Sequence, residues 1–113
     1  MDREPWERLH EHEDVWDHAM AARLEGATVL VGLTRRDSEG ERREQFFGTV
    51  MALDPVDGIT LRLEGKRRGE IVRLPPLLDA FEPADPGIYT LKEAGERVVD
   101  PDFTATWTLS RRH

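Results

Sequence analysis

Alternation of apolar and polar residues is the strongest pattern in the chain, and it recurs in short segments separated by turns. The first three segments are Ala27–Thr34, Gln45–Leu53 and Ile59–Leu63, and each shows the two-residue period of a half-buried strand. The sequence between the last two, Asp54-Pro55-Val56-Asp57-Gly58, is typical of a turn, since proline fits the first corner position. The pattern therefore predicts a strongly bent antiparallel meander.

Later segments extend this pattern. Ile71–Leu74 is a predicted fourth strand, which Pro75 ends because proline lacks a backbone N–H. Residues 77–87 form a stiff connector in which Leu78 and Phe81 are expected in the core. Two further predictions are a hairpin of residues 88–91 with residues 97–99 and a last strand over residues 103–109. That strand should bury its alternate apolar residues, which are Phe103, Ala105, Trp107 and Leu109.

A helix is predicted before the first strand. Apolar residues over positions 6–25 fall on one stripe at 3.6 residues per turn, namely Trp6, Leu9, Trp16, Met20 and Leu24. A break near residues 12–14 would let Asp14 cap a second helix from Val15 to Leu24, and Gly26 would end it. The expected role of this helix is to cover one open end of a small barrel.

Length and charge bound the organisation of the protein. At 113 residues the chain supports one domain. We divide it into an acidic helix (residues 1–25), a barrel meander (26–76) and a connector with a C-terminal β extension (77–113). The net charge of −7 is concentrated in residues 1–25, where eight acids face three arginines. An acidic chain disfavours non-specific nucleic-acid binding, so no DNA partner is expected.

Composition excludes further classes. The chain has no cysteine, so disulfides and thiolate nucleophiles are absent. It holds no apolar run long enough to span a bilayer, and its first residues lack the features of a signal peptide. We therefore expect a cytoplasmic protein that does not interact with membranes.

The meander resembles the Sm-like family of small β-barrels. The resemblance lies in Val29-x-Val31-Gly32-Leu33, Gly48-x-Val50, and Asp54 followed by Gly58-Ile59-x-Leu61, and it covers roughly residues 15–75. It implies that Gly48 permits the bend that closes the barrel, that subunits assemble into rings, and that RNA binds in the pore. The turn after Asp54 lacks the asparagine of the family's RNA site, and the family's Arg-Gly pair is matched only by Arg68-Gly69, one hairpin early.

A polar hairpin loop is predicted over residues 35–44 and a second hairpin turn over residues 64–69, and these two charged turns should lie at the same end of the meander. They carry seven basic residues, which we name the basic rim: Arg35, Arg36, Arg42, Arg43, Lys66, Arg67 and Arg68. Six acids accompany them: Asp37, Glu39, Glu41, Glu44, Glu64 and Glu70. One interpretation is a solvated, ion-paired surface, and the other is a binding site for phosphate or an acidic partner.

Residues for metal or acid–base chemistry are few. His10, Asp14 and His18 share one face of a continuous helix, but a closed site needs ligands from elsewhere, so neither a metal nor a cofactor is expected. Asp100 and Asp102, like Asp54 and Asp57, could form a carboxylate pair. Aspartates next to proline in turns more commonly accept hydrogen bonds from their own backbone.

These observations favour a non-catalytic module that binds a protein partner or a second copy of itself. Residues 71–74 or 103–109 would serve as an edge for strand pairing, with Trp6 as a candidate aromatic anchor. The first alternative is an RNA-binding riboregulator that uses the basic rim. The second is a small acid–base enzyme that uses Asp100 and Asp102.

Overall fold

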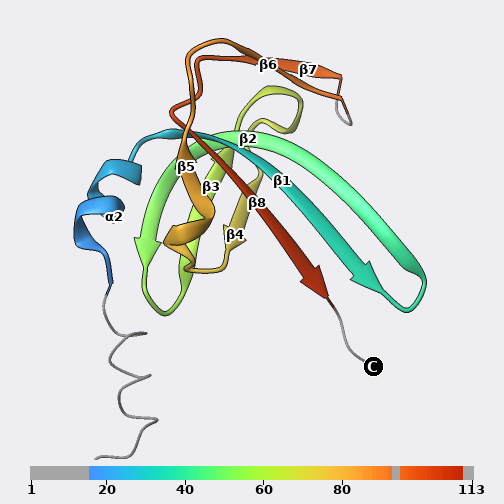
Figure 1. Ribbon diagram of the computed structural model, residues 1–113, viewed down its shortest axis with the longest axis horizontal. Helices are drawn as coiled ribbons and strands as arrows, with labels where there is room; N and C mark the ends of the chain where they lie inside the picture. The colour runs from blue at the N-terminus through green and yellow to red at the C-terminus, as the bar shows by residue number, and fades with distance from the viewer. Residues whose placement is uncertain (1–15, 93–94, 111–113) are drawn as a thin grey trace, which may run out of the picture.

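The protein is mainly β, and the computed structural model describes residues 16–92 and 95–110 (Figure 1). A six-stranded sheet has the order β4-β3-β2-β1-β8-β5, and a separate two-stranded sheet contains β6 and β7. The strands are β1 (Thr28–Asp37), β2 (Gly40–Asp54), β3 (Gly58–Leu63), β4 (Ile71–Leu74), β5 (Phe81–Pro83), β6 (Ile88–Leu91), β7 (Glu96–Val99) and β8 (Phe103–Ser110). Helix α2 (His18–Leu24) and the short 3₁₀ helices η1 (Gly65–Arg67) and η2 (Leu78–Ala80) complete the described elements.

The large sheet is curled but open. Every strand pairing is antiparallel except that of β1 with β8, which is parallel. Strands β4 and β5 end the sheet, and no pairing joins them within the described residues. The predicted β class and meander are therefore confirmed for β1 to β4, while the structure does not show a closed barrel.

Strand β2 carries the bend of the sheet, as its arched ribbon shows (Figure 1). A bulge shifts its register with β3 between Val50 and Ala52, and bulges increase local twist and bending. Gly48 is buried, and a Cβ atom there would lie 2.9 Å from the Leu63 Cα and closer still to the Arg62 carbonyl oxygen. The backbone of β3 thus approaches so closely that only glycine fits at position 48.

The first predicted turn is much shorter than expected. Residues 35–44 were predicted as a polar loop, but β1 continues to Asp37 and β2 begins at Gly40, so only Ser38 and Glu39 lie between them. Opposite charges explain the difference, because Arg36 and Glu41 are register partners and their side chains lie 2.7 Å apart. Cross-strand ion pairs of this kind allow a highly charged sequence to remain in a strand.

The last strand is part of the main sheet rather than an extension of it. β8 lies beside β1, and Phe103, Ala105 and Trp107 are in register with Val29, Val31 and Leu33. The alternation predicted for this strand is confirmed, since those three residues of β8 are buried and Leu109 is partly buried. Two parallel neighbouring strands need a long connection between them. Here residues 75–102, which follow β4, place β8 beside the edge of β1 that does not pair with β2.

One apolar core fills the concave side of the sheet. It combines residues of six strands with Leu24 of α2 and Leu78 of η2, and it includes Phe46, Ile59 and Phe81. The predicted core positions Leu78 and Phe81 are confirmed, at 8% and 4% exposure. Phe81 and Trp107 meet edge to face with ring centroids 5.3 Å apart, a favoured geometry for aromatic pairs.

Helix α2 is shorter than predicted. Within the described residues it begins at His18, and its N-cap is Asp17, whose carboxylate accepts the Met20 N–H at 2.9 Å. The proposed cap Asp14 lies outside the described residues. Trp16 and Met20 pack against the core, and Gly26 follows the helix with a φ of 78°. The expected contact between helix and sheet and the glycine after the helix are confirmed.

The predicted hairpin of residues 88–99 is confirmed as β6 and β7, and it stands apart from the large sheet (Figure 1). Leu91 and Val98 are buried although they lie outside the main core. The Glu96 carboxylate accepts the Lys66 N–H at 2.6 Å, which ties this hairpin to the η1 turn. Ile88 and Val99, which are register partners, are more than 60% exposed on its other face.

Candidate functional site

The ends of three strands extend past the last core residues as a layer that we call the arm: residues 34–37 of β1, 40–45 of β2 and 108–110 of β8 (Figure 1). Residues that are directly opposite on paired strands share a face. One arm face continues the core face and carries Arg35, Arg42 and Glu44, and the other carries Arg36, Glu41 and Arg43. The register therefore divides the basic rim between two faces.

The core face of the arm holds a bridged set of charges. Glu44 accepts a hydrogen bond from Arg35 at 2.9 Å and lies 3.5 Å from the guanidinium of Arg67. Arg67 also pairs with Glu70 at 2.8 Å, and its guanidinium carbon lies 5.2 Å from the centre of the Phe46 ring. The hydrogen bond to Glu70 raises the pKa of Arg67 and lowers the pKa of Glu70. Arg67 thus covers one end of the core.

The opposite face of the arm holds a second set of ion pairs. Glu41 accepts a hydrogen bond from Arg36 at 2.7 Å, and Arg43 lies 3.9 Å from its other oxygen. The hydrogen bond and the charge of Arg36 lower the pKa of Glu41. All three side chains are well exposed, so these pairs are expected to add little stability.

The structure thus brings the basic rim together only in part. Arg67 and Arg35 both reach Glu44, as a shared end of the meander requires, but the β1–β2 turn lies several residues farther out than η1. Within the part of the chain that the structure describes, ion pairs are formed by Arg35, Arg36, Arg43 and Arg67 of the basic rim. Arg42 and Arg68 are exposed, and no described carboxylate pairs with either. The geometry favours the ion-paired interpretation of this surface.

Strand β8 has an open edge on the side away from β1. Its pairing with β1 runs to Ser110, whereas its pairing with β5 ends at Ala105. Residues 106–110 therefore have no strand partner on that side within the described residues. Of the two predicted docking edges, residues 71–74 form a true sheet edge, whereas residues 103–105 are paired on both sides and only the second half of β8 is open.

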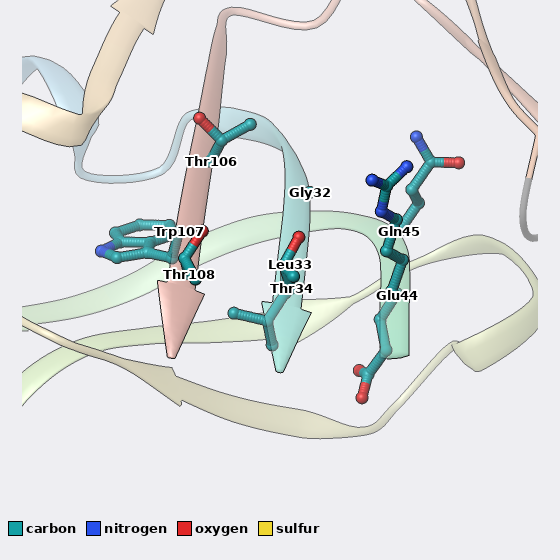
Figure 2. A pocket seen from close by; sticks show the side chains of 9 residues that line it. Gly32, Leu33, Thr34, Glu44, Gln45, Thr106, Trp107 and Thr108 are labelled. Carbon is teal, nitrogen blue, oxygen red and sulfur yellow. The ribbon is translucent and has the colours of Figure 1, made fainter. Parts of the chain in front are cut away.

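A shallow hollow of about 290 Å³ lies over β8, β1 and β2 (Figure 2). By register, its side chains come from one face: Gly32, Thr34, Arg43, Gln45, Thr106 and Thr108. Figure 2 shows Glu44 and Gln45 leaving β2 in opposite directions, which fits the strand alternation. Gly32 has no side chain and therefore leaves space beside Thr106. A Cβ atom at position 32 would lie 3.4 Å from the Thr106 methyl carbon, in ordinary van der Waals contact. The hollow is polar and adjoins the open edge of β8.

The aspartates proposed for acid–base chemistry bind backbone N–H groups. The Asp100 carboxylate accepts the Gly87 N–H at 2.7 Å, and the Asp102 carboxylate accepts the Thr28 N–H at 2.9 Å. Asp54 accepts the N–H groups of Asp57 and Val56, which lower its pKa. The interpretation as an acceptor within its own turn is confirmed for Asp54, whereas Asp100 and Asp102 accept backbone N–H groups from distant parts of the chain.

Several predicted residues fall outside this description. Trp6, His10 and Asp14 lie outside the described residues, so the anchor and the histidine–aspartate spacing stay predictions. In residues 16–92 and 95–110, no group of three His, Asp or Glu side chains is placed to hold a metal ion. Among the described residues, no helix is long and apolar enough to cross a membrane.

Sequence reasoning missed two features of this region. The open edge of β8 could not be identified, because its position depends on β5 ending at Ala105. The bond from Lys66 to Glu96 also joins turns far apart in the sequence. In the sequence, the threonines at positions 104, 106 and 108 indicate that one face of this strand carries no charge.

Comparison with known proteins adds no assignment: no family model, curated protein or solved structure matches this chain.

Proposed function

We propose that this protein is a non-catalytic interaction module that acts by pairing one of its open strand edges with a partner strand. The observation that carries the proposal is the edge of β8, where residues 106–110 pair with β1 but have no strand on the other side among the described residues. An exposed edge presents a row of backbone donors and acceptors to an incoming strand. The adjacent hollow provides space for side chains of that strand.

A non-catalytic role is supported by how the carboxylates are used. Asp100 and Asp102 each accept a backbone N–H from another part of the chain, which favours roles in holding loops in place. Glu44 and Glu41 are engaged by arginines. An acid–base enzyme that uses Asp100 and Asp102 would have to release these bonds to react.

The ion pairs of the arm also weigh against RNA binding as the main role. Phosphate binding by Arg35, Arg36, Arg43 or Arg67 would compete with carboxylates already beside them. Among the described arginines of the basic rim, only Arg42 and Arg68 offer exposed guanidinium groups without a described carboxylate partner. RNA binding therefore stands as an outcome that the experiments must be able to detect.

The proposal can be tested in living cells with a photo-crosslinking amino acid that replaces one residue of the protein at a time. Thr108 probes the β8 edge, Ile71 probes the β4 edge, and Thr90, exposed on β6, is the control. We expect protein crosslinks from Thr108 or Ile71 that exceed those from Thr90. Equal, background-level crosslinks from all three positions would refute an edge-pairing module, and crosslinks to RNA would support the riboregulator instead.

We also propose a relationship to Sm-like barrels, limited to the β1–β4 meander. It is supported by the antiparallel order of these four strands and by the close approach of β3 to Gly48 in the bent β2. The parallel β8 and the open sheet are departures from an antiparallel closed barrel. Fold similarity of this kind implies no function by itself.

A further inference from the structure

The open edges of the large sheet differ in how well they are protected against pairing. The outer edge of β5 is only three residues long and ends in Pro83. The β4 edge is only four residues long and includes Arg73. The free part of β2 before Gly48 contains four consecutive charged residues, from Glu41 to Glu44. Short length and charge are the usual devices that prevent edge pairing. In contrast, the β8 edge reads Thr-Trp-Thr-Leu-Ser over residues 106–110, with no charge and no proline.

The backbone groups of this edge can be assigned from the neighbouring pairing. The Ala84 N–H donates to the Asp102 carbonyl, so this carbonyl points toward β5, whereas the Asp102 N–H donates to the Thr28 carbonyl on the other side. Alternation from this carbonyl places the groups of Thr104, Thr106, Thr108 and Ser110 on the β5 side. Thr104 faces Glu82 of β5, but Thr106, Thr108 and Ser110 lie beyond the last paired residue, Ala105. These three residues therefore present donors and acceptors toward an open edge.

We infer that the partner at this edge is a second copy of the chain, with the two β8 strands antiparallel about a two-fold axis at Thr108. This inference rests on the proposed function and names its partner. Because β5 occupies the edge up to Ala105, the free stretch is 106–110, and Thr108 is its centre. A two-fold axis makes the contact self-complementary, so that one surface serves both copies.

Side chains on both faces suit this register. On the core face, Trp107 of one copy lies opposite Leu109 of the other, and the partly buried Leu109 gains an aromatic neighbour. On the opposite face, Thr106 lies opposite Ser110, and the two exposed Thr108 side chains lie opposite each other. No charged residue falls within the paired stretch. Since five residues form a small interface, the dimer is expected to be weak and dependent on concentration.

A charge-swap experiment tests the register. Light scattering across a concentration series is expected to show the wild-type mass rising from 13.0 kDa toward twice that value. Thr108→Lys and Thr108→Glu each place like charges opposite each other and should weaken the dimer about fivefold. An equal mixture of the two variants should restore it, whereas Thr90→Lys, exposed on β6, should leave the wild-type curve unchanged.

A second measurement uses the absence of native cysteine. Thr108→Cys should form a disulfide-linked dimer on mild oxidation, and Thr90→Cys should not. A wild-type chain that stays monomeric at all concentrations, together with no crosslink from Thr108→Cys, would overturn the self-pairing. Photo-crosslinks from Thr108 to a different protein would then leave the edge-pairing module intact and show that its partner is not a second copy.

Discussion

Arg67 and Glu44 lie 3.5 Å apart and join the η1 turn to β2 across 23 residues of sequence. The same guanidinium covers the Phe46 ring and pairs with Glu70, so one side chain closes an end of the core and fixes a turn. This arrangement assigns a structural role to a residue that charge alone places in a candidate binding surface.

Arg67→Ala should therefore destabilise the fold. We expect a loss of about 1 kcal/mol in the free energy of unfolding, because a guanidinium over an aromatic ring contributes on that order when partly exposed. Arg68→Ala is the matched control, since Arg68 is the next residue, is exposed and has no described carboxylate partner. Urea unfolding measures both variants, and equal stability of the two would contradict the assignment.

Because β3 approaches Gly48 closely, we expect the stability of the fold to depend steeply on the size of the residue at position 48. Gly48→Ala places a Cβ atom against the backbone of Arg62 and Leu63, which cannot move without distorting the sheet, so we expect a loss of about 1–3 kcal/mol. Gly32→Ala is the control, because its Cβ would meet only the Thr106 methyl group at 3.4 Å. Thermal unfolding compares them, and a harmless Gly48→Ala would refute the close approach.

The outcome for individual residues shows what sequence reasoning can reach. Strict alternation identified β8 and its buried residues Phe103, Ala105 and Trp107, because burial follows the strand period whatever the neighbour. It could not show that the neighbour is β1 in parallel, since that depends on where a long connection ends. Charge density gave the wrong answer for residues 35–44, because the Arg36–Glu41 pair forms only once the hairpin exists.

The candidate site was predictable to the same limited extent. The basic residues were identified, but their division between two faces depends on a hairpin turn of two residues, Ser38 and Glu39. The open edge at Thr106 and Thr108 depends on the length of β5, which no local pattern reveals.

Asp54 predicts a specific acid dependence. Hydrogen bonds from the Asp57 and Val56 N–H groups lower its pKa below the ordinary value of 3.8. A carboxyl group whose pKa is lower in the folded state adds stability above its unfolded pKa and loses it as the pH falls through the folded value. Asp54→Asn should therefore be less stable than wild type at neutral pH, and the difference should shrink below pH 3.8.

Urea unfolding at a series of pH values measures this difference. Asp57→Asn is the control from the same turn, since the Asp57 carboxylate accepts neither of the two hydrogen bonds held by Asp54. A gap between wild type and Asp54→Asn that stays constant down to strongly acidic pH would show that the two N–H bonds do not favour the ionised form.

The last prediction separates protein pairing from RNA binding. Because most arginines of the basic rim already engage carboxylates, a short single-stranded RNA should not shift the mass of the protein at moderate salt. If Arg42 and Arg68 alone contacted phosphates, two contacts would give a shallow salt slope of about 1.4. Replacing both residues with glutamate should leave self-association unchanged, since neither lies on the β8 edge. RNA binding that falls steeply with salt and is lost in this double variant would instead identify the basic rim as a nucleic-acid surface.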